Sequence, residues 1–162
     1  MPAAPLIVAR RENFVIRGEI GTGKTHLANA IGFACCQRGL RVLFMTAADL
    51  TTNLLESRSV DRLSRKLDQL ARYDLVILDE LGYVPFDRAG ADLNFMFITR
   101  SYERRSVIVT TNLPFPRWNE VFQDATAAAA VIDRVVHHST ILETKGKSVR
   151  LQAAEDARAA GE

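Results

Sequence analysis

Residues 18–25, with the sequence GEIGTGKT, place three glycines, a lysine and a threonine in eight positions. The segment matches the pattern G-x-x-x-x-G-K-[ST] at every fixed position. Glycines allow a tight turn whose backbone N–H groups converge on an anion, and a helix that begins there adds the positive end of its dipole. We therefore expect a phosphate-binding loop, with Lys24 reaching the β- and γ-phosphates and Thr25 holding Mg²⁺.

The expected nucleotide-binding segment comprises Gly18, Glu19, Ile20, Gly21, Thr22, Gly23, Lys24, Thr25 and His26. Glu19 is its unusual member, because a carboxylate close to bound phosphates repels them. Its side chain is expected to point to solvent or to meet a cation such as Arg17. The alternative interpretation is a glycine-rich turn between a strand and a helix, in which the lysine is incidental.

An acidic pair, Asp79-Glu80, follows the apolar run LVIL. This run predicts a buried strand, and the carboxyl ends of such strands are where open α/β sheets bind ligands. Asp79 is expected to act on Mg²⁺, directly or through water, and Glu80 to orient and polarise the attacking water as a general base. The alternative is an acidic pair that caps a helix.

Two further polar residues are candidates for the same chemistry. Asn112 ends the run IVTTN and could hold the water or the γ-phosphate, although an asparagine before Pro114 is equally typical of a turn. Arg134 lies among apolar residues of the last expected helix. It could be an arginine finger for the ATP of a neighbouring subunit. Alternatively, it could form a salt bridge to Asp133 or simply be a surface residue.

The hydrophobic pattern predicts strands that alternate with helices. Strands are expected at residues 13–16, 41–46, 74–80 and 106–112, and helices at residues 24–38, 47–58, 61–73, 87–102 and 124–138. Residues 139–144 and 147–152 are expected to form a closing hairpin, followed by a frayed tail at residues 153–162. This alternation predicts an α/β fold with a parallel sheet.

Composition limits the class of protein. The chain has 162 residues, of which 48% are hydrophobic, and a net charge of only +2, so we expect one globular domain. The two cysteines are adjacent and provide no disulfide framework, and the two neighbouring histidines, His137 and His138, are not at metal-ligand spacing and are interpreted as surface or core residues. No apolar run reaches the ~20 residues of a membrane span, so a cytoplasmic protein without a membrane partner is expected.

Longer stretches carry a resemblance to a known family. GTGKTHLANAIG, RVLFMTAADL, LARYDLVILDELGYVPFDRAGADLNFMFITRSYERRSVIVTTNLPFPRWNEVF and AAAAVIDRVVHH resemble the AAA+ ATPases of the initiator and helicase-loader branch. They are most similar to the IstB-like helper proteins of insertion-sequence transposition. The resemblance covers about residues 10–151.

The resemblance implies a P-loop NTPase core at residues 1–152, with a five-stranded parallel sheet flanked by helices. It assigns roles around an ATP molecule to these residues: Lys24 and Thr25 in the Walker A motif, Asp79 and Glu80 in Walker B, Asn112 as sensor 1 and Arg134 as arginine finger. Arg150 falls near the position where the helicase loaders carry a sensor-2-like arginine. The family usually has proline where Glu19 stands. It also carries an N-terminal helical domain, which we expect to be absent here.

The implied function is an ATP-binding and ATP-hydrolysing protein that helps a transposase select its target. The implied partners are double-stranded DNA, the transposase of the same insertion element, and further copies in a ring or filament. A helicase loader in DNA replication, or a truncated remnant that binds nucleotide weakly, are the alternative functions.

A cluster of basic residues is the candidate DNA contact. It lies in the expected helical insert after the second strand and consists of Arg58, Arg62, Arg65, Lys66 and Arg72. In the resembling family this insert faces DNA. The alternative is a solvated helix face balanced by Glu56, Asp61 and Asp68.

Overall fold

Five strands form one parallel sheet at the centre of the molecule. The structure is a computed structural model that describes residues 4–146 and 148. The strands are β1 (Asn13–Gly18), β2 (Val42–Thr46), β3 (Leu75–Leu81), β4 (Ser106–Thr111) and β5 (Ser139–Thr144). Their order is β2-β3-β4-β1-β5, and all neighbouring pairs are parallel. The predicted α/β fold with a five-stranded parallel sheet is therefore confirmed.

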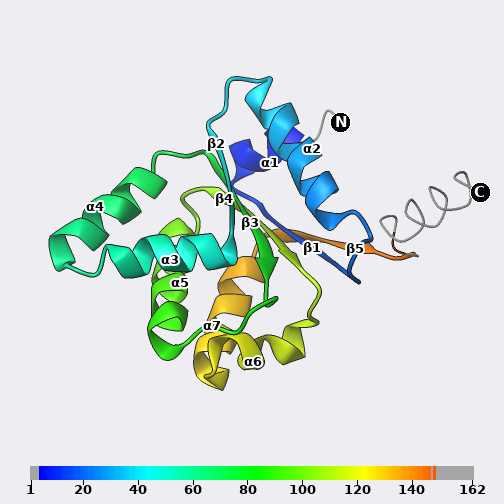
Figure 1. Cartoon of the computed structure of the whole chain (residues 1–162). Helices are drawn as coiled ribbons and strands as arrows, with labels where there is room; N and C mark the ends of the chain where they lie inside the picture. Colours follow the sequence, from blue (N-terminus) through cyan, green and yellow to red (C-terminus); the bar gives the residue numbers. More distant parts are fainter. Residues whose placement is uncertain (1–3, 147, 149–162) are drawn as a thin grey trace, which may run out of the picture.

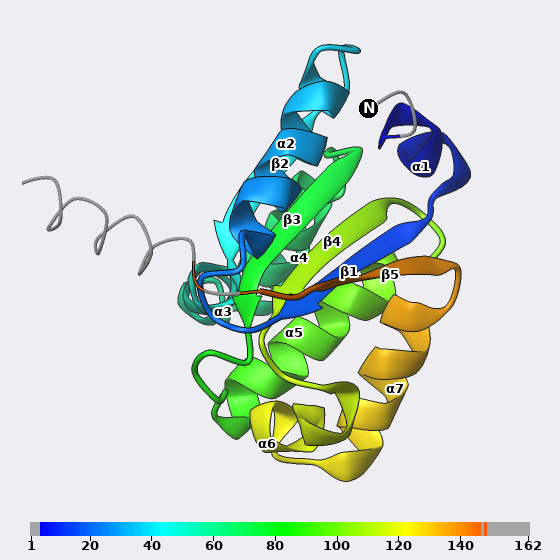
Figure 2. The ribbon, with the colours of Figure 1, turned by 90° about the vertical axis from the view of Figure 1, so that its right-hand side faces the viewer.

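Helices cover both faces of this sheet. They are α1 (Ala4–Arg10), α2 (Lys24–Cys36), α3 (Ala47–Glu56), α4 (Val60–Leu70), α5 (Arg88–Ser101), α6 (Trp118–Phe122) and α7 (Ala125–Val136), with a 3₁₀ turn η1 (Phe115–Arg117) before α6. Helices α1 and α2 lie on one face, and α3, α5 and α7 lie on the other (Figure 2).

Side chains of each central strand alternate between two apolar cores, as the pleat of a strand requires. Phe14 and Ile16 of β1 pack under α2, whereas Val15 packs among the helices of the opposite face. On β3, Ile77 lies in the first core and Leu78 in the second. Burial on both faces explains why the central strands are continuous apolar runs in the sequence.

Three elements differ from the sequence-based expectations. Helix α1 and helix α6 were not predicted, because seven and five residues are too few to show a helical period. Helix α6 nevertheless buries Trp118 completely. Strand β5 pairs in parallel with β1, and the second strand of the expected hairpin, residues 147–152, lies outside the described residues apart from Ser148. The expected tail, residues 153–162, lies outside them as well.

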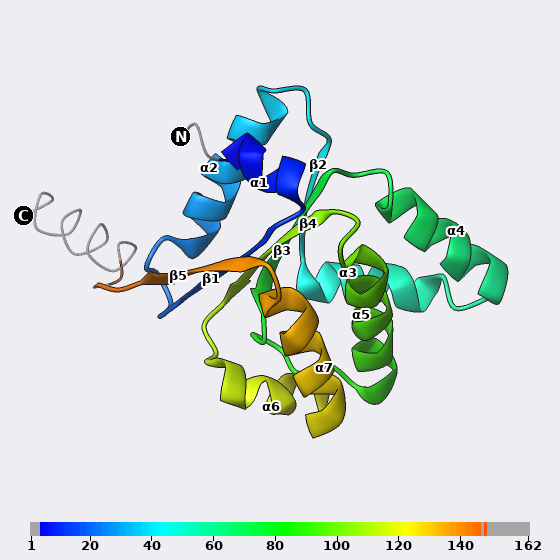
Figure 3. The ribbon, with the colours of Figure 1, turned by 180° about the vertical axis from the view of Figure 1, so that it is seen from behind.

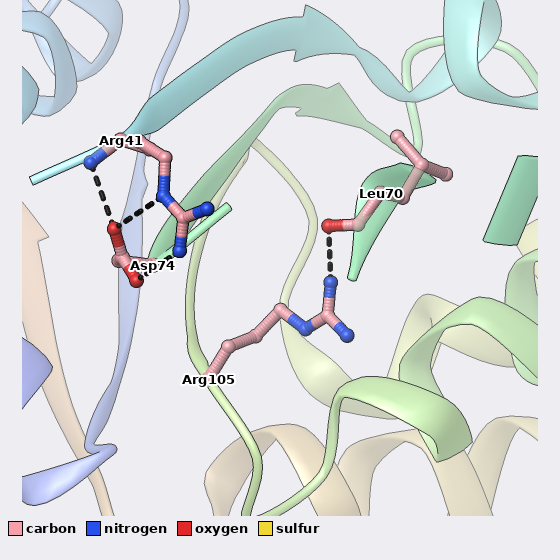
Figure 4. Close-up of polar contacts among 4 residues, drawn as sticks. All are labelled: Arg41, Leu70, Asp74 and Arg105. Atoms are coloured by element: carbon pink, nitrogen blue, oxygen red, sulfur yellow. Dashed lines mark hydrogen bonds and ion pairs between the residues drawn. The ribbon is translucent and has the colours of Figure 1, made fainter. Parts of the chain in front are cut away.

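Helix α4 lies at the periphery, beyond the edge strand β2 (Figures 1 and 3). Two arginines bind the end of α4 and the segment that joins it to β3 (Figure 4). Arg41 donates to the Asp74 carboxylate from its backbone N, Nε and Nη2, at 2.9, 3.2 and 3.1 Å. Arg105 is 7% exposed and donates to the carbonyl of Leu70, the last residue of α4. Because the last carbonyls of a helix have no partner within the helix, Arg105 caps α4.

Among the described residues, no helix is both long and apolar enough to cross a lipid bilayer.

Candidate nucleotide-binding site

The glycine-rich loop joins the carboxyl end of β1 to the first residue of α2. Gly21 and Gly23 have φ angles of 84° and 88°, in the left-handed region that glycine adopts without strain. Gly23 is the N-cap of α2, and no side chain bonds to the helix at this position. The first N–H groups of α2 are therefore directed at the loop, which is the arrangement that binds an anion.

A cavity of about 440 Å³ opens beside this loop. Its wall joins two parts of the sequence: the loop and the start of α2, through Gly21, Gly23, Lys24, Thr25 and His26, and the ends of β3 and β4, through Glu80 and residues 110–112. The volume lies within the range of small-molecule pockets. The parallel sheet thus brings the two candidate motifs of the sequence to one cavity.

Thr25, in the cavity wall, contacts Asp79, which does not itself line the cavity. The Thr25 hydroxyl lies 3.1 and 3.0 Å from the two carboxylate oxygens of Asp79, which is 4% exposed. A hydroxyl and a carboxylate are the hard oxygen donors that Mg²⁺ prefers. The residues present therefore fit the ion that the sequence implies.

Thr110 connects Asp79 to Glu80. Its hydroxyl donates to Asp79 Oδ1 and accepts a hydrogen bond from the backbone N–H of Glu80 at 2.9 Å. Thr110 is 1% exposed, so both bonds are shielded from water. No role for Thr110 was predicted, because nothing local in IVTTN indicates which threonine lies opposite the acidic pair.

A β-bulge at the end of β3 places Glu80. Leu78 pairs with Val109 and Leu81 with Thr111, so two residues of β3, Asp79 and Glu80, stand opposite the single residue Thr110. Glu80 has a φ angle of 60°, which is rare outside glycine, and it is exposed in the cavity wall. Because a bulge changes the direction of a side chain, Asp79 and Glu80 can both serve one site.

Lys24 folds onto its own loop. Its Nζ lies 2.6 Å from the backbone carbonyl of Glu19, which also accepts a bond from the Thr22 hydroxyl at 2.8 Å. The Glu19 side chain is exposed to solvent, in agreement with one of the two expectations. The other expectation, a contact between Glu19 and Arg17, is wrong, because Arg17 pairs with Glu143 at 2.8 Å. The hydrogen bond from Arg17, helped by the charge of Lys145, holds the pKa of Glu143 below its ordinary value.

The sequence matches the family description "IstB-like ATP binding protein" over residues 3–157. The chain belongs to this family. It is 45% identical over 145 residues to a Pseudomonas aeruginosa protein named as an ATP-binding protein of insertion sequence IS21. It is 43% identical over 143 residues to the corresponding protein of IS232 from Bacillus thuringiensis. These alignments cover 90% and 88% of the chain but 55% and 57% of the relatives, so the chain spans just over half of their length.

Solved structures show the same fold. The DnaC helicase loader matches this IstB-like chain with a TM-score of 0.70 and 22% identity, over 89% of the chain and 87% of the loader. DnaA from Aquifex aeolicus with bound AMPPCP matches with a TM-score of 0.74 and 18% identity, over 96% of the chain and 48% of DnaA. The IstB-like chain therefore has the fold of AAA+ initiators and loaders.

Several expected site residues lie outside the cavity of the IstB-like chain. Gly18, Glu19 and Thr22 belong to the loop but do not line the cavity, and the Thr22 hydroxyl is 2.7 Å from that of Thr144 on β5. Asn112 lines the cavity as expected, and Ile20 and Tyr83 also line it. The position expected to resemble sensor 2, Arg150, lies outside the described residues.

Arg134 is in α7 and does not line the cavity of its own chain. Its Nη1 donates to the carbonyl of Ala130 at 2.9 Å, and its guanidinium lies 5.3 Å from the centre of the Phe95 ring. Within the described part of the chain it forms no ion pair with Asp133, so the expected salt bridge is wrong. Its side chain is partly exposed.

The basic cluster of the IstB-like chain lies around α4. Lys66 and Arg72 border a second cavity of about 480 Å³ between α4 and β2, which Arg41 also lines. Arg62 bonds to Ser59 and Arg65 to the backbone of Asp61, while Asp68 pairs with Arg100 at 3.4 Å. Over residues 4–146, no member of the cluster forms an ion pair with Glu56, Asp61 or Asp68.

Proposed function

We propose that this chain binds ATP with Mg²⁺, hydrolyses the ATP, and assists a transposase in selecting its DNA target. The observation that carries the proposal is the contact of Thr25 with Asp79 beside the glycine-rich loop. It joins a phosphate-binding motif to an acidic strand end, which is the pairing that P-loop NTPases use.

The loop and the start of α2 supply the binding groups. Backbone N–H groups around Gly21 and Gly23 surround the phosphates, and the helix dipole favours their negative charge. On binding, Lys24 exchanges the carbonyl of Glu19 for the β- and γ-phosphates. This exchange replaces a bond to a neutral carbonyl oxygen by an ion pair with an anionic phosphate, in which both partners are charged.

Thr25 and Asp79 are the residues that would hold Mg²⁺. When bound, the ion neutralises charge that develops on the phosphates. Thr110 orients one oxygen of Asp79, because its hydroxyl donates to that oxygen and is itself fixed by the N–H of Glu80. The Asp79 carboxylate that would hold the ion is therefore already oriented by Thr110.

Glu80 and Asn112 act on the attacking water. The carboxylate of Glu80 lies in the cavity wall and can accept the proton of a water molecule placed there, while the Asn112 amide can orient that molecule. Arg134 would complete the site from a second copy of the chain, because it lies away from the cavity of its own copy. There it would neutralise charge on the γ-phosphate.

The proposed role in transposition is supported by the names of the relatives. Both are ATP-binding proteins of insertion sequences. The basic cluster around α4 is the proposed contact for double-stranded DNA, and the transposase of the same insertion element is the proposed protein partner. The fold match to the DnaC helicase loader supports helicase loading as a second candidate. A chain that binds nucleotide weakly without turnover is the third.

The test is steady-state phosphate release from ATP, with and without duplex DNA, by the wild-type chain and by Glu80→Gln. We expect turnover by the wild type and a loss of at least ~100-fold in the variant, with nucleotide binding retained. Equal turnover by both proteins would remove Glu80 from the mechanism, and no turnover by either at high concentration would leave the third candidate. Co-purification with a transposase or with a replicative helicase separates the first two.

A further inference from the structure

A group of metal-ligating side chains lies at the end of the sheet opposite the nucleotide loop. Ligand atoms of Glu103, His137 and His138 all lie within 4.8 Å of one another. Glu103 comes from the turn before β4 and the two histidines from the turn before β5. The carboxylate is therefore distant from the histidines in the sequence, and its proximity was not predicted. All three side chains are exposed and accessible to an ion from solution.

The backbone around this group is closely held. Glu103 and His138 both have a φ angle of 55°, in the left-handed region that costs energy for residues other than glycine. Arg11 donates to the carbonyl of Glu103 at 2.9 Å, and the backbone N–H of Asn13 donates to the carbonyl of His138 at 3.0 Å. These contacts tie both turns to the segment that leads into β1.

Side chains next to the group also restrict it. The hydroxyl of Tyr102 lies 2.7 Å from Nδ1 of His137, and the rings of His137 and His138 meet edge to face with centres 4.0 Å apart. Asn13 is buried, and its amide group bonds to the carbonyl of Val135 at 3.2 Å and to the N–H of Val107 at 3.0 Å. It thereby fixes the end of α7 against β4, where α5 and α7 run side by side (Figure 3).

We propose that Glu103, His137 and His138 bind one transition-metal dication such as Zn²⁺. Two imidazoles and one carboxylate are a common ligand set for Zn²⁺, and a fourth position remains open to solvent. Mg²⁺ is a poor candidate, because it prefers oxygen ligands. A hydrogen bond such as that of Tyr102 to His137 is the type of contact that orients a ligating imidazole.

The bound ion would join the turns at the ends of α5 and α7. It would stabilise the folded chain by mass action, because the ligands are brought together only in the folded state. The site is separate from the nucleotide cavity and does not depend on the proposed ATPase activity.

The test is a calorimetric titration of the full chain, without purification tag or nucleotide, with Zn²⁺ alone. We expect one saturable site in the wild type, and affinity at least ~10-fold weaker in Glu103→Gln and in His138→Asn. Asparagine is chosen because it tolerates the left-handed backbone of residue 138. His26→Ala removes the third histidine of the chain, which lies in the nucleotide cavity, and Cys36→Ser removes the exposed thiol. Both controls should bind Zn²⁺ as the wild type does.

Thermal unfolding provides the second measurement. Zn²⁺ should raise the midpoint of the wild type and of both controls, and should leave Glu103→Gln and His138→Asn unchanged. Circular dichroism establishes that each variant is folded before titration. The proposal is overturned if the wild type shows no saturable binding, or if the folded Glu103 and His138 variants bind as tightly as the wild type.

Discussion

The hydroxyl of Thr25 lies 3.1 and 3.0 Å from the two carboxylate oxygens of Asp79, although 54 positions separate the residues in the sequence. The contact forms because α2 begins at the carboxyl end of β1 and Asp79 stands near the carboxyl end of β3, on the same edge of the sheet. It therefore prepares two oxygen ligands before any nucleotide is bound.

Thr110 is expected to position the acidic pair. Thr110→Val keeps the shape of the side chain but removes the hydroxyl that accepts from the N–H of Glu80 and donates to Asp79 Oδ1. We expect the kcat for ATP hydrolysis to fall by at least ~10-fold, with a smaller change in KM. Thr110→Ser retains the hydroxyl and should restore most of the kcat. A serine variant as impaired as the valine variant would show that packing, and not the hydroxyl, is responsible.

Arg134 is expected to act on the ATP of a neighbouring copy. Neither Arg134→Ala nor Lys24→Ala should hydrolyse ATP alone. A mixture of the two should recover activity, because the Lys24 variant can supply Arg134 to a neighbour whose nucleotide site is intact. The ratio of the two variants and the total protein concentration are varied while phosphate release is measured.

The control for Arg134 is Phe95→Leu, which removes the ring contact but leaves the arginine. It should retain activity that rises with protein concentration. If the mixture is as inactive as its components, the role in trans is wrong.

The basic cluster is expected to contact DNA phosphates. Replacing Arg62, Arg65 and Arg72 by glutamine should weaken binding of a labelled duplex and reduce the slope of log K against log salt by about 2 to 3. Fluorescence anisotropy at several salt concentrations measures both quantities. The matched control replaces Arg38, Arg104 and Arg117 by glutamine, because these arginines are also exposed but lie outside the basic cluster. An equal loss of affinity in the two triple variants would contradict a specific role of the cluster.

Asp74 should make stability depend on pH. Its hydrogen bonds from Arg41 lower the pKa of Asp74 in the folded chain. The stabilisation is therefore complete above the unfolded pKa of about 3.9 and is lost as the pH falls through the folded value. In urea unfolding, the free energy difference between the wild type and Asp74→Asn should be largest near neutral pH and shrink below about pH 4. A difference that stays constant with pH would contradict this effect.

The sequence was informative where function depends on local spacing. The eight-residue loop pattern and the acidic pair after an apolar strand predicted the positions of Lys24, Thr25 and Glu80 in the cavity wall, because each motif is a strand end that leads into a fixed turn. Asn112 was predicted in the same way. The parallel sheet followed from the alternation of strands and helices.

The remaining features depend on contacts between distant segments. The bulge at Asp79 and Glu80, and with it the role of Thr110, is set by the register of β3 against β4. The group formed by Glu103 and the two histidines depends on two turns that meet only in the folded chain. Neither relationship has a local pattern in the sequence.

Calorimetric titration of the chain with ATP, with Mg²⁺ and with EDTA, tests the central claim most directly. It compares the wild type with Lys24→Ala, Asp79→Asn and the control Lys145→Ala, whose lysine lies away from the cavity wall. We expect the wild type and the Lys145 variant to bind ATP more tightly with Mg²⁺. The Lys24 variant should not bind, and the Asp79 variant should bind without any gain from Mg²⁺. A wild type that binds no ATP, or an Asp79 variant that keeps the full gain from Mg²⁺, would contradict the proposed site.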